Sequence, residues 1–339
     1  MGTYLTPIIP RRNITLKHLY GKTIAFDALV ELYQFLSLIR QPDGTPLKAP
    51  NGTITSHLVG LSYRLSRLIS DYHIKPIFVF DGPPHPLKER IIKERKKQSE
   101  KAYKEWLEAL KRGDLETAFS KAVVAIRLNN QMIDDAMKLL TLMGIPVIKS
   151  PHDAEAQAAY IVKRGEAWCI GSKDYDSLLY GGKRLVRFIT FTGFEYLPSK
   201  HTIRPLKPEL IELETVLNSL RITYEQLIDI AILIGTDYNE GIPGVGPKKA
   251  LKLIKKYGSI ENLMTYKMVI PDFDINEVRS IFLNPDVNKN YQIKFNPPNK
   301  NGLIRFLVDE KGFSLSRVKI IIERLEKAEI WRSKQITLG

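Results

Sequence analysis

Two short apolar segments of the chain each end in an aspartate, and a helical pattern separates them. The segments are "KTIAFDAL", which contains Asp27, and "KPIFVFDGPP", which contains Asp81. Between them, "HLVGLSYRLSRLISDY" has apolar residues at helical spacing. The order strand, helix, strand is typical of a parallel sheet.

Similar segments follow later in the chain. "GIPVIKSP", "AWCIGSKDYD" and "RLVRFIT" are further strand candidates, and helical "DAEAQAAYIVKRG" lies between the first two. We therefore expect an α/β fold whose mostly parallel central sheet is flanked by helices and runs to about residue 200. With 339 residues and 44% apolar residues, the chain can build a sizeable core as two domains, or as one domain with a large appendage.

The charge balance indicates the kind of partner. A net charge of +14 favours a polyanion, nucleic acid before membrane, although a merely soluble basic protein is the alternative. The single cysteine, Cys169, excludes an internal disulfide, and the six histidines lack the spacing of a zinc site. We find no signal peptide and no apolar run long enough for a bilayer. These features predict a soluble, intracellular (cytoplasmic) protein without a membrane partner.

Residues 85–125 do not fit a plain α/β core. They are polar, charged and helical in composition, and basic residues crowd their first half: Lys88, Arg90, Lys93, Arg95, Lys96, Lys97, Lys101 and Lys104. We interpret this segment as a helical excursion from the sheet. A solvated amphipathic helix pair without a function is the alternative, and composition does not separate the two.

The segment "NEGIPGVGPKKALKLIKKYGSIENL", residues 239–263, predicts a helix, a glycine hairpin and a second helix. Pro247 suits the first turn of the second helix, and Lys248, Lys249 and Lys252 follow it. Backbone N–H groups beside lysines suit a phosphate. An ordinary helix–turn–helix corner is the alternative, but glycines followed by lysines favour phosphate binding. The chain then reads as mostly helical to about residue 330, apart from a loop rich in proline and asparagine.

Acids recur where the predicted strands end, or in the loops and helix starts that follow: Asp27, Asp81, Asp153, Glu155, Asp174, Asp176 and Asp237. Ligand sites in open α/β sheets form at this edge. Carboxylates so close together repel one another unless cations are present, and oxygen ligands suit Mg²⁺ or Mn²⁺. Asp27 or Asp153 alone could be a helix cap, but the repeated pattern favours a metal cleft. In a basic protein, such a cleft fits phosphodiester hydrolysis with two metal ions.

Several long motifs resemble the flap endonucleases, the structure-specific 5′ nucleases of replication and repair. They are "YQFLSLIRQPDGTPL", "TSHLVGLSYR", "PIFVFDGPP", "LMGIPVIKSPHDAEAQAAY", "GSKDYDSLLYG" and "ILIGTDYNEGIPGVGPKKAL". The resemblance runs in the same order from about residue 14 to 330 and is greatest to the archaeal enzymes. It implies that six of the acids match the metal ligands of that family, with Asp153 at one further position. The six are Asp27, Asp81, Glu155, Asp174, Asp176 and Asp237.

The resemblance also implies roles for other residues. Lys88 and Arg95 match arch residues that face the scissile phosphate, and residues 85–125 match the helical arch through which a 5′ single strand passes. Tyr33 matches the aromatic that stacks on the terminal base pair, and Arg40 lies in the wedge that bends the duplex. The hairpin at 241–246, with Gly244 and Gly246, matches the duplex-binding motif, which in the family also holds K⁺.

Three features depart from the family pattern. Position 153 is usually glutamate, and the shorter Asp153 would reach a metal only through water. The usual N-terminal "GxxxL" is matched only loosely, by Gly2 and Leu5, and we expect Gly2 near the metals. "KQITLG" resembles the opening of a sliding-clamp-binding motif, which Gln335 and Leu338 match. Its paired aromatics would follow Gly339, so the sequence predicts a motif that is cut short.

The resemblance implies a monomeric, Mg²⁺-dependent 5′-flap endonuclease and 5′–3′ exonuclease, for which Mn²⁺ can substitute. Its substrate would be branched or flapped DNA in Okazaki fragment processing and repair. We expect a nuclease core at 1–84 and 126–238, an arch at 85–125, a helical DNA-binding region at 239–330 and a clamp-binding tail at 331–339. The alternatives are a non-catalytic junction-binding protein, which a complete acid set disfavours, and an RNA-cleaving nuclease with a similar acidic cleft, which the hairpin and arch disfavour.

Overall fold

The computed structural model describes residues 2–191, 193–197, 202–266, 268 and 271–330. In this part of the chain, one sheet has seven strands in the order β1-β9-β6-β5-β2-β3-β4. Strands β2 to β6 run parallel, whereas β9 is antiparallel to both β6 and β1. The strands are β1 (Arg12–Asn13), β2 (Thr23–Asp27), β3 (Lys75–Phe80), β4 (Val147–Lys149), β5 (Cys169–Gly171), β6 (Arg184–Arg187) and β9 (Glu209–Glu212). The prediction of a mostly parallel central sheet is confirmed.

Alternating side chains of the central strands build two cores. Phe26 and Phe78 point to one face, where they pack with α1, α2, α5 and α14. Ala25 and Ile77 point to the other face, toward α6, α7 and α9. Because both faces are covered, the strands read as continuous apolar runs in the sequence. The helices are α1 (Ala28–Leu38), α2 (Ser56–Tyr72), α5 (Asn130–Leu142), α6 (Ala154–Lys163), α7 (Asp176–Leu179), α9 (Tyr224–Ile234) and α14 (Leu315–Ala328).

The prediction that the α/β core ends near residue 200 is wrong. Strand β9 extends it, and a separate hairpin of β7 (Gly193–Leu197) and β8 (Thr202–Leu206) precedes β9. Strand β9 has the sequence "ELIE", which is too polar to predict from its apolar content. It is held by cross-strand ion pairs, Arg184–Glu212 at 3.3 Å and Arg187–Glu209 at 2.9 Å.

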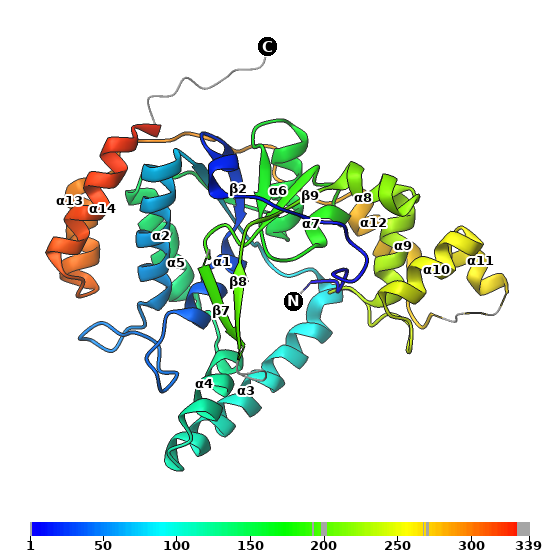
Figure 1. Cartoon of the computed structure of the whole chain (residues 1–339), viewed down its shortest axis with the longest axis horizontal. Coiled ribbons are helices and arrows are strands. Elements are labelled where there is room, and N and C mark those ends of the chain that lie inside the picture. The colour runs from blue at the N-terminus through cyan, green and yellow to red at the C-terminus, as the bar shows by residue number, and fades with distance from the viewer. Residues whose placement is uncertain (1, 192, 198–201, 267, 269–270, 331–339) are drawn as a thin grey trace.

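Residues 85–125 form the helices that their composition predicts. A 3₁₀ turn, Pro86–Lys88, leads into α3 (Glu89–Lys111), and α4 (Leu115–Ala125) returns beside it. The pair projects away from the rest of the molecule, at the bottom of Figure 1. The turn between the helices has Gly113 at φ +71° and Asp114 as the cap of α4.

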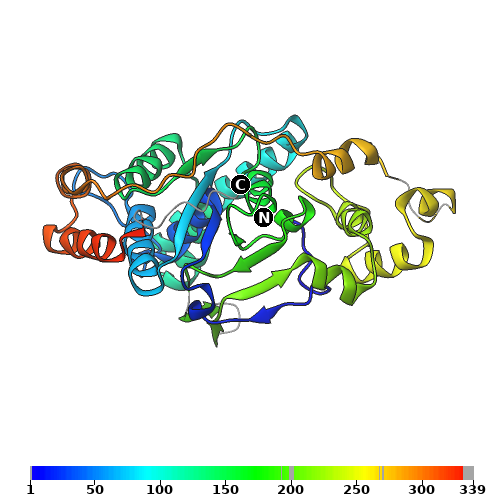
Figure 2. The same cartoon turned by 90° about the horizontal axis from the view of Figure 1, so that it is seen from above.

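The remaining helices lie at two ends of the molecule. The set α8 (Leu213–Leu220), α10 (Pro247–Tyr257), α11 (Ile260–Thr265) and α12 (Ile275–Leu283) extends the side of α9. A long loop then crosses to α13 (Lys300–Ile304), which packs on α5, while α14 packs on α2. Figures 1 and 2 place α13 and α14 opposite α10 and α11. Among the described helices, none is long and apolar enough to cross a membrane.

Candidate active site

Two of the predicted acids follow the central strands. Asp27 ends β2 and caps α1, where its Oδ1 accepts a hydrogen bond from the Val30 amide at 3.1 Å. Asp81 directly follows β3, and its Oδ1 accepts a hydrogen bond from the Ala154 amide at 2.8 Å. Asp27 therefore caps a helix, the role that the sequence analysis gave as the alternative to metal binding. It also lies beside Asp81 at the carboxyl edge of the sheet.

Four further acids lie at the starts of α6 and α7. Asp153 is the N-cap residue of α6, and Glu155 lies in its first turn. Asp176 is the first residue of α7, and Asp174 precedes it by two positions. Both helices follow parallel strands, β4 and β5, so their starts lie at the edge that also carries Asp27.

The N-terminal segment lies against one of these acids. The amide of Thr3 donates a hydrogen bond to Asp176 Oδ1 at 2.7 Å. A Cβ atom on Gly2 would lie 2.5 Å from Asp176 Oδ2, so the backbone approaches this carboxylate as closely as only glycine allows.

The acids affect each other's ionisation, which shows that they share one cleft. Burial raises the pKa values of Asp27 and Glu155 well above their ordinary range, and those of Asp81 and Asp176 to about 6. Repulsion adds to burial in each case. Asp81 raises the pKa of Asp27, Asp176 raises that of Glu155, and Asp237 raises that of Asp176.

The donor set fits a divalent cation. The ligand candidates are all carboxylate oxygens, and Glu155 Oε1 is buried without a hydrogen-bond partner. A buried carboxylate with neighbouring carboxylates and an unsatisfied oxygen is stabilised by a cation of the Mg²⁺ type. Within the described residues, however, no three histidine, cysteine, aspartate or glutamate side chains are grouped closely enough to hold one ion. The acids thus share a cleft without forming a closed ligand set.

Two basic residues of the projecting helix pair reach into this cleft. The ammonium of Lys88 contacts the Asp153 carboxylate and lies 3.9 Å from Asp237 Oδ2. The guanidinium of Arg95 donates a hydrogen bond to Asp237 Oδ1 at 2.6 Å. Although burial lowers the pKa of Lys88, the nearby carboxylates outweigh it and raise that pKa. The start of α3 therefore supplies cations to the acid cluster.

Lys93, on the same helix, faces another direction. Its ammonium pairs with Glu89 on the helix surface, and its side chain is 67% exposed. Lys88, by contrast, is 15% exposed in its side chain. The two lysines differ in surroundings although only one turn and a half of helix separates them.

Of the two predicted DNA contacts near the wedge, Tyr33 lies on α1, whereas Arg40 lies two residues beyond its end. Tyr33 is 39% exposed. The Arg40 guanidinium donates hydrogen bonds to the carbonyl oxygens of Leu36, at 2.6 Å, and Gly44, at 2.5 Å. Burial lowers the pKa of Arg40 to about 10. Its guanidinium thus ties the loop around Gly44 to the end of α1.

The glycine hairpin lies between α9 and α10, and Pro247 begins α10 as predicted. Gly244 has φ +73°, which a residue with a Cβ adopts only under strain. The Lys249 ammonium donates a hydrogen bond to the Gly244 carbonyl at 3.3 Å. Lys248, Lys249, Lys252 and Gly246 are all exposed. Gln335 and Leu338, the predicted clamp contacts, lie outside the described residues.

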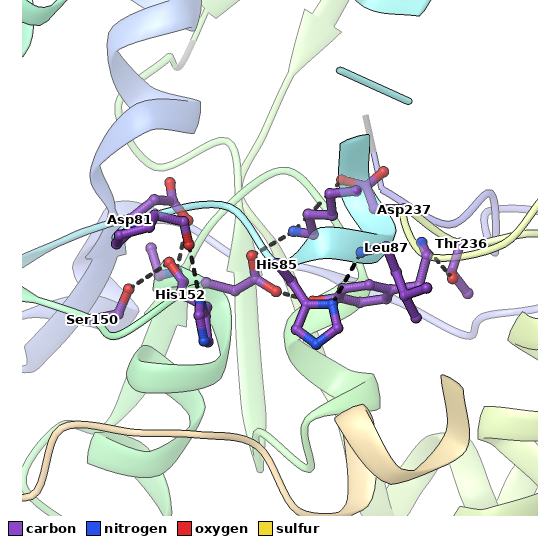
Figure 3. A network of polar contacts seen from close by, with 12 residues as sticks. Asp81, His85, Leu87, Ser150, His152, Thr236 and Asp237 are labelled. Carbon is purple, nitrogen blue, oxygen red and sulfur yellow. Dashed lines mark hydrogen bonds and ion pairs between the residues drawn. The ribbon is translucent and has the colours of Figure 1, made fainter. Parts of the chain in front are cut away.

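Two tyrosines lie beside Asp153, and the sequence analysis missed both. Tyr180 and Tyr238 are buried, and their hydroxyls both contact Asp153. Together with Asp153, His85, His152 and residues of α12, they line a hollow of about 370 Å³, to which the other six predicted acids do not contribute. In Figure 3, His85 lies between Asp81 on one side and Asp237 on the other. Tyr238 directly follows Asp237, and this is the only sequence feature that could have placed it in the site. No sequence feature indicates Tyr180, because the orientation of its side chain depends on the fold.

Comparison with known proteins identifies the family. The XPG N-terminal domain family matches residues 3–102, and the XPG I-region family matches residues 144–237. Flap endonuclease 1 of Pyrococcus abyssi is 49% identical over 339 residues, which cover 100% of this chain and 97% of that protein. The chain belongs to the flap endonuclease family. Flap endonuclease 1 of Archaeoglobus fulgidus is 46% identical and covers 100% of this chain and 99% of its own length.

Solved structures agree with this family assignment. Flap endonuclease-1 from Methanococcus jannaschii has a TM-score of 0.76 and 38% identity, covering 96% of this chain and 98% of its own. The catalytic core of Rad2 in complex with DNA substrate has a TM-score of 0.71 at 24% identity, covers 95% of this chain and 97% of its own, and shares the fold. The resemblance to the archaeal flap endonucleases predicted from the motifs is confirmed.

Proposed function

We propose that this flap endonuclease family member is a structure-specific nuclease that hydrolyses a phosphodiester near the single-strand/duplex junction of flapped DNA. The observation that carries the proposal is the cluster of buried carboxylates, which raise each other's pKa values and are faced by Lys88 and Arg95. A protein that only binds DNA gains nothing from carboxylates that repel phosphate. The activity would serve Okazaki fragment processing and repair, as a 5′-flap endonuclease and 5′–3′ exonuclease.

Nucleases of this family depend on divalent metal ions, and we propose Mg²⁺ as the ion here, with Mn²⁺ able to replace it. The proposed ligands are Asp27, Asp81, Glu155, Asp174, Asp176 and Asp237. When bound, two such ions activate water and offset negative charge on the phosphate. Asp153 has side-chain partners at both of its oxygens, and two of these partners are tyrosine hydroxyls.

The residues of the chain itself prepare the cleft for phosphate. Lys88 and Arg95 hold positive charge at the open side of the carboxylates, where a phosphate oxygen would otherwise be repelled. Fixed cations that face a developing negative charge lower the barrier without reorganisation. We propose that both stabilise the charge that develops on the scissile phosphate.

Binding of the duplex would use other basic residues. On α10, the exposed lysines Lys248, Lys249 and Lys252 follow the glycine turn at the N-terminus of the helix. Backbone N–H groups and lysines together bind phosphate without reading the base sequence. We assign this duplex contact to the hairpin, with a K⁺ ion there as in the family, and stacking on the terminal base pair to Tyr33. Arg40 would hold the loop of the wedge in place through its hydrogen bonds to the carbonyl oxygens of Leu36 and Gly44.

Three further proposals rest on family resemblance. The helix pair α3–α4 would be the arch that admits the 5′ single strand, between the two parts of the nuclease core. The enzyme would act as a monomer. Gln335 and Leu338 would contact a sliding clamp, and calorimetry with the clamp measures that contact.

One assay tests the proposed function. A double-flap DNA labelled at its end is incubated with the protein and Mg²⁺, and in parallel with EDTA. Cleavage near the junction with Mg²⁺ alone supports the proposal. Binding without cleavage in Mg²⁺ and Mn²⁺ would instead support a non-catalytic junction-binding protein.

A further inference from the structure

Asp153 has a different environment from the other acids of the cleft. One oxygen, Oδ1, contacts the Lys88 ammonium. The other, Oδ2, accepts a hydrogen bond from the Tyr180 hydroxyl at 2.8 Å and also contacts the Tyr238 hydroxyl. The two hydroxyls lie 2.6 Å apart. Every oxygen of this carboxylate is therefore engaged by a neighbouring side chain.

Glu155, two residues later on the same helix, shows the contrast. Its Oε1 is buried and has no partner, as expected of a group that awaits a cation. Asp153 has no such free oxygen, and the partners it does have are hydrogen-bond donors. Asp237 also has cationic partners, Arg95 and Lys88, but only Asp153 is held by two tyrosine hydroxyls as well as by a cation.

The two tyrosine hydroxyls and Asp153 Oδ2 make three close contacts with one another. Two tyrosines bring two protons to the three contacts, so each hydroxyl donates once and the carboxylate stays an acceptor. The Asp153 carboxylate is thus the common acceptor of the tyrosine hydroxyls and the Lys88 ammonium.

Both tyrosine rings are fixed by packing. Tyr180 is 2% exposed and lies 5.1 Å from the Phe282 ring. Tyr238 is 7% exposed, packs on Phe282 and contacts the His85 ring edge-on at 5.7 Å. Because neither ring can turn freely, their hydroxyls hold the carboxylate in one orientation.

We propose that Tyr180 and Tyr238 are positioning residues that hold Asp153 as the counter-ion of Lys88, and that Asp153 thereby places the Lys88 ammonium over the cleft instead of ligating a metal ion. The inference rests on the proposed function, in which Lys88 stabilises charge on the phosphate. A lysine side chain has high rotamer entropy, so a fixed counter-ion reduces the cost of bringing the ammonium to its place. The Tyr238 ring, 5.0 Å from the ammonium, supports the same position.

The short side chain at position 153 agrees with this role. A glutamate at this position would carry its carboxylate one methylene further from the helix. The Tyr180 and Tyr238 hydroxyls already contact the aspartate oxygens, so a longer side chain would collide with them. The two tyrosine hydroxyls therefore leave space for an aspartate side chain at position 153 but not for a longer one.

The test compares Tyr180→Phe with Tyr224→Phe. The first substitution removes only the hydroxyl that binds Asp153. The second removes a neighbouring hydroxyl that donates to the Leu179 carbonyl at 2.5 Å, and serves as the matched control. Single-turnover cleavage of flapped DNA at saturating enzyme, DNA binding in Ca²⁺ and the Mg²⁺ concentration for half-maximal rate are measured for each. We expect Tyr180→Phe to lower the rate about tenfold, the effect of one hydrogen bond to a charged group, with unchanged DNA affinity and Mg²⁺ requirement.

A double-mutant cycle with Lys88→Ala decides how the tyrosine acts. If Tyr180 works through Lys88, Tyr180→Phe has no further effect on a protein that lacks Lys88. A full additional loss in that background, or an increased Mg²⁺ requirement, would mean that Asp153 is a metal ligand and would overturn the proposal. An equal loss in Tyr224→Phe would assign the effect to folding and also overturn it.

A measurement without metal or DNA separates this inference from the proposed function. The acylation rate of Lys88 is followed by mass spectrometry in EDTA, where the ion pair with Asp153 should protect the ammonium. We expect Tyr180→Phe to raise this rate severalfold and Tyr224→Phe to leave it unchanged. An unchanged rate in Tyr180→Phe would refute the positioning role, whatever the outcome of the cleavage assay.

Discussion

Glu31 is a buried carboxyl that the proposed chemistry does not use, and it offers a precise test of the electrostatics near the cleft. It lies on α1, one turn beyond Asp27, and is 3% exposed. Thr190 and Gln34 donate hydrogen bonds to its Oε2. Burial nevertheless dominates and raises the pKa of Glu31 from 4.5 to about 7. The perturbation is Glu31→Gln, which keeps the shape and removes the charge.

The raised pKa has a definite consequence for stability. Below pH 4.5, Glu31 is protonated in the folded and the unfolded chain alike, and it does not affect the free energy of unfolding. As the pH rises, the unfolded chain loses the proton first, so the folded state becomes less stable until the pH passes about 7. At about 1.4 kcal/mol per pKa unit, the total loss from Glu31 is about 3 kcal/mol. Glu31→Gln should be more stable than the parent by about this amount at pH 8, relative to pH 4.

The assay is denaturant unfolding in EDTA at pH values from 4 to 8. The relevant quantity is the difference between variant and parent, because the raised pKa values of Asp81 and Asp176 give both proteins a slope of the same sign. Glu108→Gln, at an exposed site on α3, is the control for removing one carboxylate from the chain. A constant difference between Glu31→Gln and the parent from pH 4 to 8 would refute the reasoning.

Three other predictions concern activity. Lys88→Ala should lower the single-turnover rate by about 10²-fold or more while changing DNA affinity less than about tenfold, whereas Lys93→Ala should be milder; equal losses would make the arch an electrostatic funnel only. Asp176→Ala should abolish cleavage but leave flap binding in Ca²⁺ intact, and near-normal turnover at saturating Mg²⁺ would contradict its assignment as a ligand. Lys248→Ala with Lys252→Ala should weaken binding to all duplex sequences alike and flatten the log–log salt dependence by about 2; a loss limited to certain sequences would argue against phosphate contacts.

The parallel part of the sheet was predictable because its strands are buried on both faces. Such strands need continuous apolar residues, as in β3 and β5, and the sequence shows these directly. Strand β9 was not predictable, because it carries only two apolar residues between two glutamates. Its glutamates pair with arginines of β6, a contact that exists only after the fold has formed.

The positions of the acids were predictable for a similar reason. Six of the seven follow a strand or lie at the start of a helix, and the carboxyl ends of parallel strands meet at one edge; Asp237 lies in the loop after α9 instead. What binds each acid was not predictable, since the partners come from distant parts of the chain. The Thr3 amide reaches Asp176 and the Tyr180 hydroxyl reaches Asp153 only through the packing of the N-terminal segment and α7.

The loop between α9 and α10 connects the two elements proposed to contact DNA. Near its start, Asp237 binds Arg95 and Glu240 binds Arg90, at 2.6 and 2.9 Å, so the loop is tied to the base of the arch. At its end, the turn at Gly244 leads into the lysines of α10. The Arg90–Glu240 pair is exposed, and such pairs contribute about 0–1 kcal/mol, so a phosphate can displace Glu240 at little cost. Asp237 is only 17% exposed in its side chain and shares the cleft with the other acids, so its pair with Arg95 is screened less by solvent. A duplex bound at α10 and a single strand bound at the arch therefore act on opposite ends of the loop between α9 and α10. Asp237 of this loop also belongs to the catalytic cleft.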